Sequence, residues 1–211
     1  MIVHQIYYDF NNKNEPMPKL FFELQKKVVK WCKKNMYSYK FWNKSMLDKL
    51  LNKYPKYKNQ INNVRYEIMK VDMIKFLILY NEGGLYLDLD IEPKIKKLKD
   101  VDFAVSLSPK MKMYNVDVVQ SKKGNMINLH YLDFVKKQIE EKSKLKIYDV
   151  WKVRYVLQTT GPRSFTRFLN TNKIKPITYR TNDAHNNPPR LNLIGNEDFL
   201  DYPSGAWLGK K

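Results

Sequence analysis

Residues 81–93 read Asn-Glu-Gly-Gly-Leu-Tyr-Leu-Asp-Leu-Asp-Ile-Glu-Pro, which predicts a helix end, a buried strand and two neighbouring carboxylates. Because glycine adopts left-handed backbone without strain, the two adjacent glycines are expected to end a helix and reverse the chain. Along residues 85–91 an aliphatic residue occupies every second position, which predicts a strand. In a strand, every second side chain lies on the same face. Tyr86, Asp88 and Asp90 would share that face, so two carboxylates point the same way.

Two carboxylates on one face repel each other unless a cation or a hydrogen-bond network holds them. A hard divalent cation prefers oxygen ligands, which makes Asp88 and Asp90 candidate ligands for Mn²⁺ or Mg²⁺. The alternative interpretation is a pair of solvated acids at a strand end, with no bound ion.

Composition predicts one globular unit over residues 1–211, since 43% of the chain is hydrophobic and that is enough for a sizeable core. The formal net charge is +18, from 39 basic and 21 acidic residues. Such a field attracts phosphate-bearing substrates, polyanions or anionic membrane surfaces. A generally solvated basic surface is the alternative.

The single cysteine, Cys32, excludes an internal disulfide and is expected to be a buried thiol on the apolar side of a helix. No apolar run reaches the length of a membrane span, and the chain opens on a strand-like segment instead of a signal peptide. We therefore expect a cytoplasmic protein or a soluble domain of a larger chain.

Apolar periodicity predicts an α/β sheet, mostly parallel and flanked by helices, because strands and helices alternate over the first hundred residues. Polar residues 55–63 are expected to form a loop near the mouth of the site, and residues 182–189 another loop. The remaining elements are predicted as strands at 2–8, 37–42, 102–107 and 113–119, and helices at 18–35, 46–54 (capped by Ser45), 64–82 and 125–142.

Residues 65–93 resemble the signature of DXD-containing sugar transferases, in particular glycosyltransferase family 32, with clostridial toxin glucosyltransferases as more distant relatives. The resemblance is carried by Asp72 and Lys75, followed by Leu-Tyr, Gly-Gly and the Asp-Leu-Asp of the opening stretch. It implies a GT-A-type fold that transfers a hexose from a nucleotide-diphosphate sugar to a hydroxyl acceptor, with retention of configuration. A UDP-sugar is favoured and GDP-mannose is the alternative donor.

The same resemblance implies roles for individual residues. Asp90 would bind the metal directly, and Asp88 would contact the ribose or bind the metal through water. Asp201, near the C-terminus, is chemically able to complete the coordination shell. The other implied donor-binding residues are His4, Gln5, Ile6 and Tyr7 around the base, Asp72 and Lys75 at the ribose and phosphates, Asn115 and Asp117 beside the site, and Trp207 in the tail.

Structural alternatives stand beside these roles. The alternative for His4 is a hydrogen-bonded histidine of the core. The alternative for Tyr7 is a core aromatic instead of a stacking platform for the base. Asp72 and Lys75, three residues apart on a helix, could form a surface ion pair worth about 0.2–0.5 kcal/mol. The family's usual arginine is replaced by Lys75, which keeps the charge but loses the bidentate fork.

Two other functions fit parts of the sequence. A basic protein with paired acids could be a metal-dependent nucleic-acid enzyme, although no nucleic-acid motif is present and no nucleic-acid partner is expected. A fold that binds a sugar nucleotide without turnover is the second. The acceptor is expected to be a glycan or a protein-linked glycan, with peripheral contact to an anionic membrane.

Overall fold

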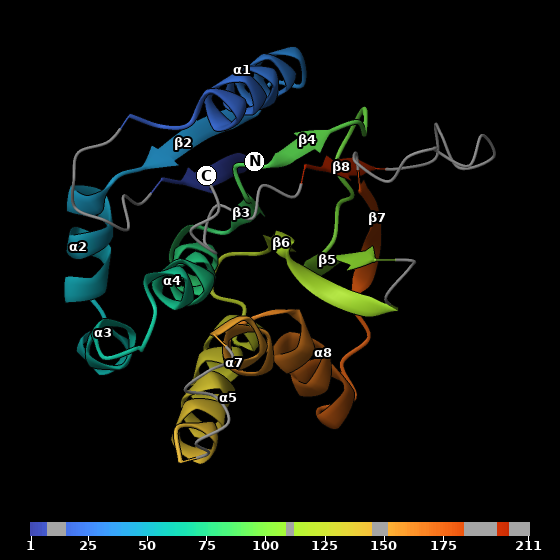
Figure 1. Ribbon diagram of the computed structural model, residues 1–211. Coiled ribbons are helices and arrows are strands. Elements are labelled where there is room, and N and C mark those ends of the chain that lie inside the picture. The colour runs from blue at the N-terminus through green and yellow to red at the C-terminus, as the bar shows by residue number, and fades with distance from the viewer. Residues whose placement is uncertain (8–15, 109–111, 145–151, 184–197, 203–211) are drawn as a thin grey trace.

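The computed structural model describes residues 1–7, 16–108, 112–144, 152–183 and 198–202. Within them, eight strands form one sheet and helices cover both of its faces (Figure 1). The strands are β1 (Ile2–Ile6), β2 (Ser38–Trp42), β3 (Gly84–Leu87), β4 (Ile91–Pro93), β5 (Phe103–Ser108), β6 (Met113–Ser121), β7 (Ile177–Asp183) and β8 (Phe199–Asp201). The helices are α1 (Lys19–Lys34), α2 (Lys44–Asn52), α3 (Pro55–Asn62), α4 (Glu67–Glu82), α5 (Ile127–Lys142), α7 (Lys152–Thr159) and α8 (Pro162–Thr171).

The sheet is mixed, with strand order β2-β1-β3-β6-β5-β7-β8-β4. Four of its pairings are parallel, namely β1 with β2, β1 with β3, β5 with β7 and β7 with β8. The other three pairings, β3 with β6, β5 with β6 and β4 with β8, are antiparallel. The mostly parallel α/β sheet expected from the alternating sequence is therefore confirmed.

The sheet curls strongly between β3 and β4. These strands are neighbours in sequence, yet β3 lies inside the sheet and β4 pairs with β8 at its far end. The curl brings the far end of the sheet back towards the end of β3, where residues 88–90 connect the two strands. The carboxylate pair therefore lies where the edge strand β4 comes back towards the end of the interior strand β3.

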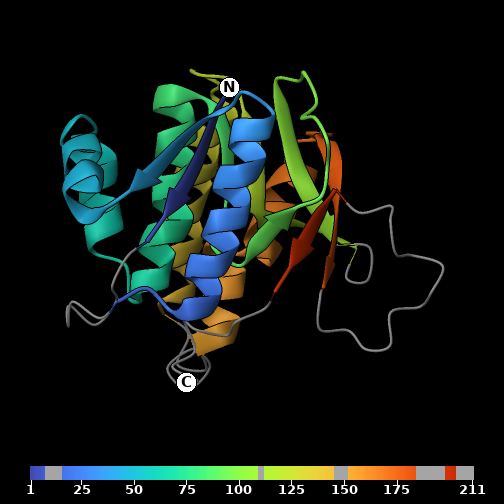
Figure 2. The ribbon, with the colours of Figure 1, turned by 90° about the horizontal axis from the view of Figure 1, so that it is seen from above.

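Helix α1 covers one face of the sheet and the larger group of α4, α5, α7 and α8 covers the other (Figure 1). Viewed from above, α1 runs alongside β1 and β4 (Figure 2). Its buried residues Leu24, Val28 and Cys32 recur at helical spacing, and Val28 and Cys32 pack against strand residues of the sheet. The expectation that Cys32 is a buried thiol is confirmed. None of the helices in the described residues is long and apolar enough to cross a membrane.

Helix α4 is the central element, and it is buried on nearly all sides. Residues 71–79 are all buried, because α4 packs against β1, β3 and β6 as well as against α2, α3 and α5. Gly83 and Gly84 end it with φ values of 69° and 106°, as expected. A side chain at Gly84 would collide with the carbonyl of Ile2 in the neighbouring strand, so glycine is required there.

The predicted strand over residues 85–91 is wrong in its second half. β3 ends at Leu87, and the Ile91 amide donates to the Asp88 carbonyl at 3.2 Å, which closes a turn before β4 begins. Asp88 therefore follows the strand directly, whereas Asp90 lies in the turn.

Three smaller expectations are also wrong. Residues 55–63 form mainly α3 instead of a loop, because Pro55 suits the first helical turn and Tyr57 and Ile61, one turn apart, are buried. Asn43, not Ser45, caps α2 by accepting a hydrogen bond from the Met46 amide at 3.0 Å. The predicted loop at 182–189 is strand to residue 183, and the rest lies outside the described residues.

Candidate active site

The candidate site is built on a buried lysine between two carboxylates. The Lys75 ammonium lies 3.3 Å from Oδ1 of Asp72, one helical turn earlier, and 3.1 Å from Oδ1 of Asp88 at the end of β3. It also donates to the Val116 carbonyl at 3.1 Å, and its side chain is 0% exposed. Burial lowers the pKa of Lys75, but the two carboxylates outweigh that effect and raise it above the ordinary value.

This geometry corrects the sequence-based alternatives for Lys75. A surface ion pair is excluded because the ammonium is fully buried. A direct phosphate contact is not favoured either, since an ammonium has three N–H donors and three protein oxygens already accept them. Lys75 instead acts on Asp88, which it neutralises and holds in place.

Asp88 has one carboxylate oxygen held by the protein and the other directed elsewhere. Its Oδ1 accepts from Lys75 and, at 2.8 Å, from the Tyr86 hydroxyl. Among the described residues, its side-chain hydrogen bonds and ion pairs all fall on Oδ1, which leaves Oδ2 for a ligand. The side chain is 32% exposed, so that oxygen can meet solvent or a bound molecule.

Asp90 lies in the turn after Asp88 and is half-buried. Burial raises its pKa to about 7, with further contributions from the negative charges of Asp88 and Asp117. Its backbone carbonyl accepts from the Tyr202 amide at 2.9 Å, which ties the turn to the end of β8. A carboxylate with such a raised pKa is one that a nearby cation would stabilise.

Asp117 comes from the strand beside β3, and its own carbonyl accepts from the Asp88 amide at 2.9 Å. Its carboxylate accepts from the hydroxyl of Ser106 through Oδ1 and from the amide of Asn115, at 3.4 Å, through Oδ2. Burial raises the pKa of Asp117 to about 6, although the Ser106 hydrogen bond opposes the shift. Asp117 therefore lies beside Asp88 with its carboxylate engaged by protein donors, and Asn115 contacts that carboxylate.

Asp72 is tied to the second half of the chain. Its Oδ2 accepts from the Thr160 hydroxyl at 2.8 Å, and Thr160 immediately precedes the Gly161-Pro162 start of α8. Burial raises the pKa of Asp72 to about 6, while Lys75 and the Thr160 hydrogen bond oppose the shift. The Thr160, Asp72, Lys75 and Asp88 side chains therefore form one continuous buried polar chain that ends at the surface.

The carboxylates fit a divalent cation that is held partly by its substrate. The described residues contain no group of three or more His, Cys, Asp or Glu side chains arranged for a metal ion. Mg²⁺ is commonly bound by one or two carboxylates with substrate phosphates and water as the other ligands. Asp90 and the unengaged oxygen of Asp88 suit that kind of site better than a closed protein cage.

The end of β1 combines three buried residues, His4, Gln5 and Ile6, with the half-buried Tyr7 that follows it. His4 is 0% exposed, and its ring nitrogens face the Gly83 carbonyl at 2.8 Å and the Trp42 indole N–H at 3.1 Å. Burial lowers its pKa. Its side chain is therefore engaged in the core, in line with the structural alternative, and it could contact a ligand only by leaving these partners.

The other residues of this segment differ in exposure. Gln5 donates to the Asp88 carbonyl at 3.2 Å and accepts from the Tyr39 hydroxyl at 3.0 Å, so it supports the site from below. Ile6 is 4% exposed and belongs to the core. Tyr7 is half-buried at the end of the segment.

The C-terminal candidates are only partly described. Asp201 ends β8 and pairs with Ile91, the residue after Asp90, so the backbone brings it beside the carboxylate turn. Trp207 lies outside the described residues.

Three supporting residues were missed by sequence reasoning as functional residues: Tyr86, Ser106 and Thr160. The alternation of β3 places Tyr86 on the same face as Asp88, which could have indicated their hydrogen bond. Ser106 and Thr160 reach Asp117 and Asp72 from other parts of the chain, and no spacing rule predicts such pairs.

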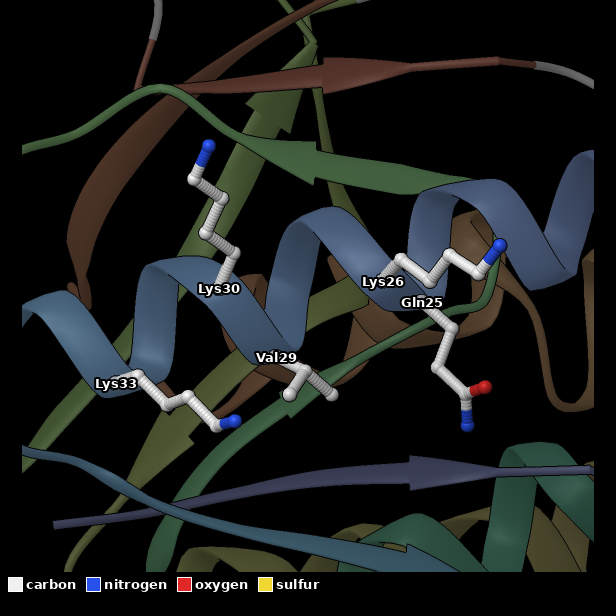
Figure 3. Close-up of a pocket in the computed structure, with 5 residues that line it drawn as sticks. All are labelled: Gln25, Lys26, Val29, Lys30 and Lys33. Atoms are coloured by element: carbon white, nitrogen blue, oxygen red, sulfur yellow. The ribbon is translucent and has the colours of Figure 1, made fainter.

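Two open hollows of the described surface lie away from these carboxylates. One, of about 300 Å³, runs along α1 (Figure 3). The other, of about 260 Å³, lies among α2, α3 and α4. We place the candidate site at the carboxylates because their chemistry, and not the concavity, indicates a ligand.

Comparison with known proteins defines the class that this arrangement resembles. Residues 18–103, from α1 to the start of β5, match the family model described as the glycosyltransferase sugar-binding region containing DXD motif. This stretch includes Asp72, Lys75 and both carboxylates of the DXD motif. The chain thus resembles DXD-containing glycosyltransferases of the family 32 type.

Individual relatives agree with that class. Inositol phosphoceramide mannosyltransferase 3 of Schizosaccharomyces pombe is 31% identical over 100 residues, which cover 42% of this chain and 27% of that protein. The solved structure of the PaToxG glycosyltransferase is similar with a TM-score of 0.55 and 17% identity, covering 81% of this chain and 68% of that one. The second likeness is one of fold.

Proposed function

We propose that residues 1–211 act as one GT-A-type glycosyltransferase unit that transfers a hexose from a nucleotide-diphosphate sugar to a hydroxyl acceptor. The observation that carries the proposal is the geometry of the DXD carboxylates. Asp88 is fixed through one oxygen with the other left for a ligand, and Asp90 has a pKa raised to about 7 by burial and by its acidic neighbours.

The chemistry requires a centre that accepts negative charge. Breaking the bond between sugar and phosphate leaves that charge on the nucleoside diphosphate, and bound Mn²⁺ or Mg²⁺ would stabilise it as a Lewis acid. We assign Asp90 as the direct ligand and Asp88 as the residue that meets the donor ribose or binds through water. Lys75 and Tyr86 keep Asp88 in the orientation that either role needs.

The donor and acceptor follow from the resemblance. A UDP-sugar is the favoured donor, with retention of configuration, and the half-buried Tyr7 is the candidate platform for its base. GDP-mannose is the alternative donor, in keeping with the mannosyltransferase named among the relatives. The acceptor would be a glycan or a protein-linked glycan, and the charge of +18 favours peripheral contact with an anionic membrane.

A thermal-shift screen tests the proposal. UDP-sugars, GDP-mannose and a short oligonucleotide would each be added with and without Mn²⁺, and any stabilising donor would be followed in a hydrolysis and transfer assay. We expect stabilisation by a sugar nucleotide that depends on Mn²⁺, together with turnover. Binding without turnover would indicate a sugar-nucleotide-binding protein, and stabilisation by the oligonucleotide alone would contradict the proposal.

A further inference from the structure

Helix α1 carries a strongly basic outer surface. Its inner residues are in the core, whereas Lys19, Lys26, Lys27, Lys30, Lys33 and Lys34 are exposed. Figure 3 shows three of these lysines, Lys26, Lys30 and Lys33, with side chains that extend outward from α1. The only acid in α1 is Glu23, and it is ion-paired with Lys26 at 3.1 Å.

The segment that follows β4 extends this surface. The Trp31 indole donates to the Ile95 carbonyl at 2.7 Å, which fixes the segment against α1. Lys94, Lys96 and Lys97 are exposed beside it. Glu92, the acid at its edge, is ion-paired with both Lys27 and Lys94, at 2.9 and 2.6 Å. We call the exposed lysines of α1 and residues 94–97 the basic face.

Apolar side chains stand at both ends of α1. Leu20 and Phe22 in its first two turns are 39% and 46% exposed, and Met36, just after its end, is 92% exposed. The Lys26 ammonium lies 4.2 Å from the centre of the Phe22 ring. A lysine-rich helix surface with exposed aromatic and aliphatic groups at its ends suits shallow contact with a phospholipid headgroup layer.

We propose that the basic face is a docking surface for anionic phospholipid membranes. Each lysine near such a surface adds favourable attraction, and clusters of four to eight bind anionic lipids. The core position of Leu24 and Val28 prevents deep insertion of α1, so the contact is peripheral and shallow. A nucleic acid would use the same charges but would gain little from Leu20, Phe22 and Met36.

The basic face also borders the candidate site. Lys27 pairs with Glu92, two residues after Asp90, and the Tyr202 hydroxyl donates to the same Glu92 at 2.9 Å. The Tyr202 amide in turn donates to the Asp90 carbonyl. Docking through the basic face would therefore hold the carboxylate turn close to the membrane. This last step rests on the proposed function, whereas the docking itself does not.

Vesicle co-sedimentation tests the docking. The probes are phosphatidylcholine vesicles with and without about 30% phosphatidylserine, compositions that differ in surface charge. The first variant is Lys30→Glu with Lys33→Glu, and the second is Leu20→Ser with Phe22→Ser. The matched control is Lys137→Glu with Lys144→Glu, which makes the same charge change in and just after α5, across the sheet from α1 (Figure 1).

We expect the unmodified protein to bind only the anionic vesicles. The α1 charge variant should lose at least about tenfold in partitioning, while the α5 control stays within about twofold. The apolar variant should lose about threefold or more with its charge unchanged. Donor hydrolysis in solution should be the same for all variants, so a failure of docking and a failure of the proposed function give different results.

Two results would overturn the proposal. Equal losses in the α1 and α5 charge variants would show that total charge, and not this face, attracts the vesicles. Full vesicle binding by the apolar variant, together with displacement of the vesicles by a duplex oligonucleotide, would assign the basic face to nucleic acid or polyanions in general.

Discussion

The Lys75 ammonium lies 3.1 Å from Oδ1 of Asp88, fully buried beneath a carboxylate that is 32% exposed. This contact connects the core of α4 to the surface at the end of β3. Because Lys75 also contacts Asp72 and the Val116 carbonyl, the charge of Asp88 is balanced from inside the protein. The orientation of Asp88 therefore depends on the packing of the core, and not only on its own backbone.

Replacing Lys75 tests this dependence. Lys75→Met should lower the free energy of unfolding by about 3–5 kcal/mol, because it leaves two carboxylates without their buried cation. Lys75→Arg keeps the charge but adds volume in a filled core, and should cost about 1–3 kcal/mol. Urea unfolding measures both. The control is Lys70→Met, which removes a partly exposed pair with Glu67 on the same helix and should cost less than about 0.5 kcal/mol. Similar losses for Lys70 and Lys75 would contradict the buried network.

Thr160 gives a test that depends on pH. Thr160→Val keeps the shape of the buried side chain but removes the hydrogen bond to Asp72. The pKa of Asp72 is raised to about 6, so its carboxylate is charged at pH 8 and protonated at pH 4.5 in the folded protein. The loss of stability should thus be larger at pH 8, about 1–3 kcal/mol.

Thr160→Ser is the matched control, since it keeps the hydroxyl and loses only a methyl group. The loss of unfolding free energy in Thr160→Ser should be the same at pH 4.5 and pH 8. These two values lie on either side of the pKa of about 6 for Asp72. Unfolding curves for both variants at both pH values make the comparison. If Thr160→Val lowers the free energy of unfolding by the same amount at both pH values, Thr160 does not stabilise the charged form of Asp72.

Asp90 should destabilise the metal-free protein at high pH. Its pKa is raised from 3.8 to about 7 in the folded state, so the folded protein binds this proton more tightly than the unfolded chain does. The stability that the proton provides is complete below about pH 4 and is lost as pH rises towards 7. In chelator, Asp90→Asn should therefore have the higher melting temperature at pH 8 and lose that advantage near pH 4. If Asp90→Asn raises the melting temperature by the same amount at pH 4 and pH 8, the pKa of Asp90 is not raised in the folded protein.

Tyr7 tests the proposed base platform. If its ring stacks on the nucleobase, Tyr7→Ala should weaken binding of free UDP by about 1–3 kcal/mol, and binding of the UDP-sugar by the same amount. Titration calorimetry with both ligands measures the two losses. An unchanged affinity for UDP would show that Tyr7 does not stack on the base and has only a structural role.

The sequence predicts the backbone of the site better than its side-chain contacts. The glycine pair and the Leu-Tyr-Leu-Asp alternation locate the end of α4 and the position of Asp88, because both are local effects of backbone conformation. The place of Asp90 was harder to predict. Apolar Leu89 and Ile91 continue the strand pattern, yet the curl of the sheet requires a turn there.

The burial of Lys75 could not be read from periodicity. A charged residue beside an apolar stripe usually faces solvent, but α4 is enclosed by the sheet and by α2, α3 and α5. Only tertiary packing brings Asp88 to the ammonium, and the same holds for the contact between Thr160 and Asp72. Local propensity carries no information about such distant partners.

The most direct test of the central claim is the rate of donor-sugar hydrolysis at saturating Mn²⁺ in Asp88→Asn and Asp90→Asn. The control is Asp102→Asn, an exposed carboxylate paired with Lys122 outside the site. We predict that both site variants lose at least about 100-fold in rate while they remain folded, because each loses charge needed where the diphosphate leaves. The control should keep the unmodified rate. Near-equal rates in all three variants would contradict the assignment of Asp88 and Asp90 as the catalytic metal site.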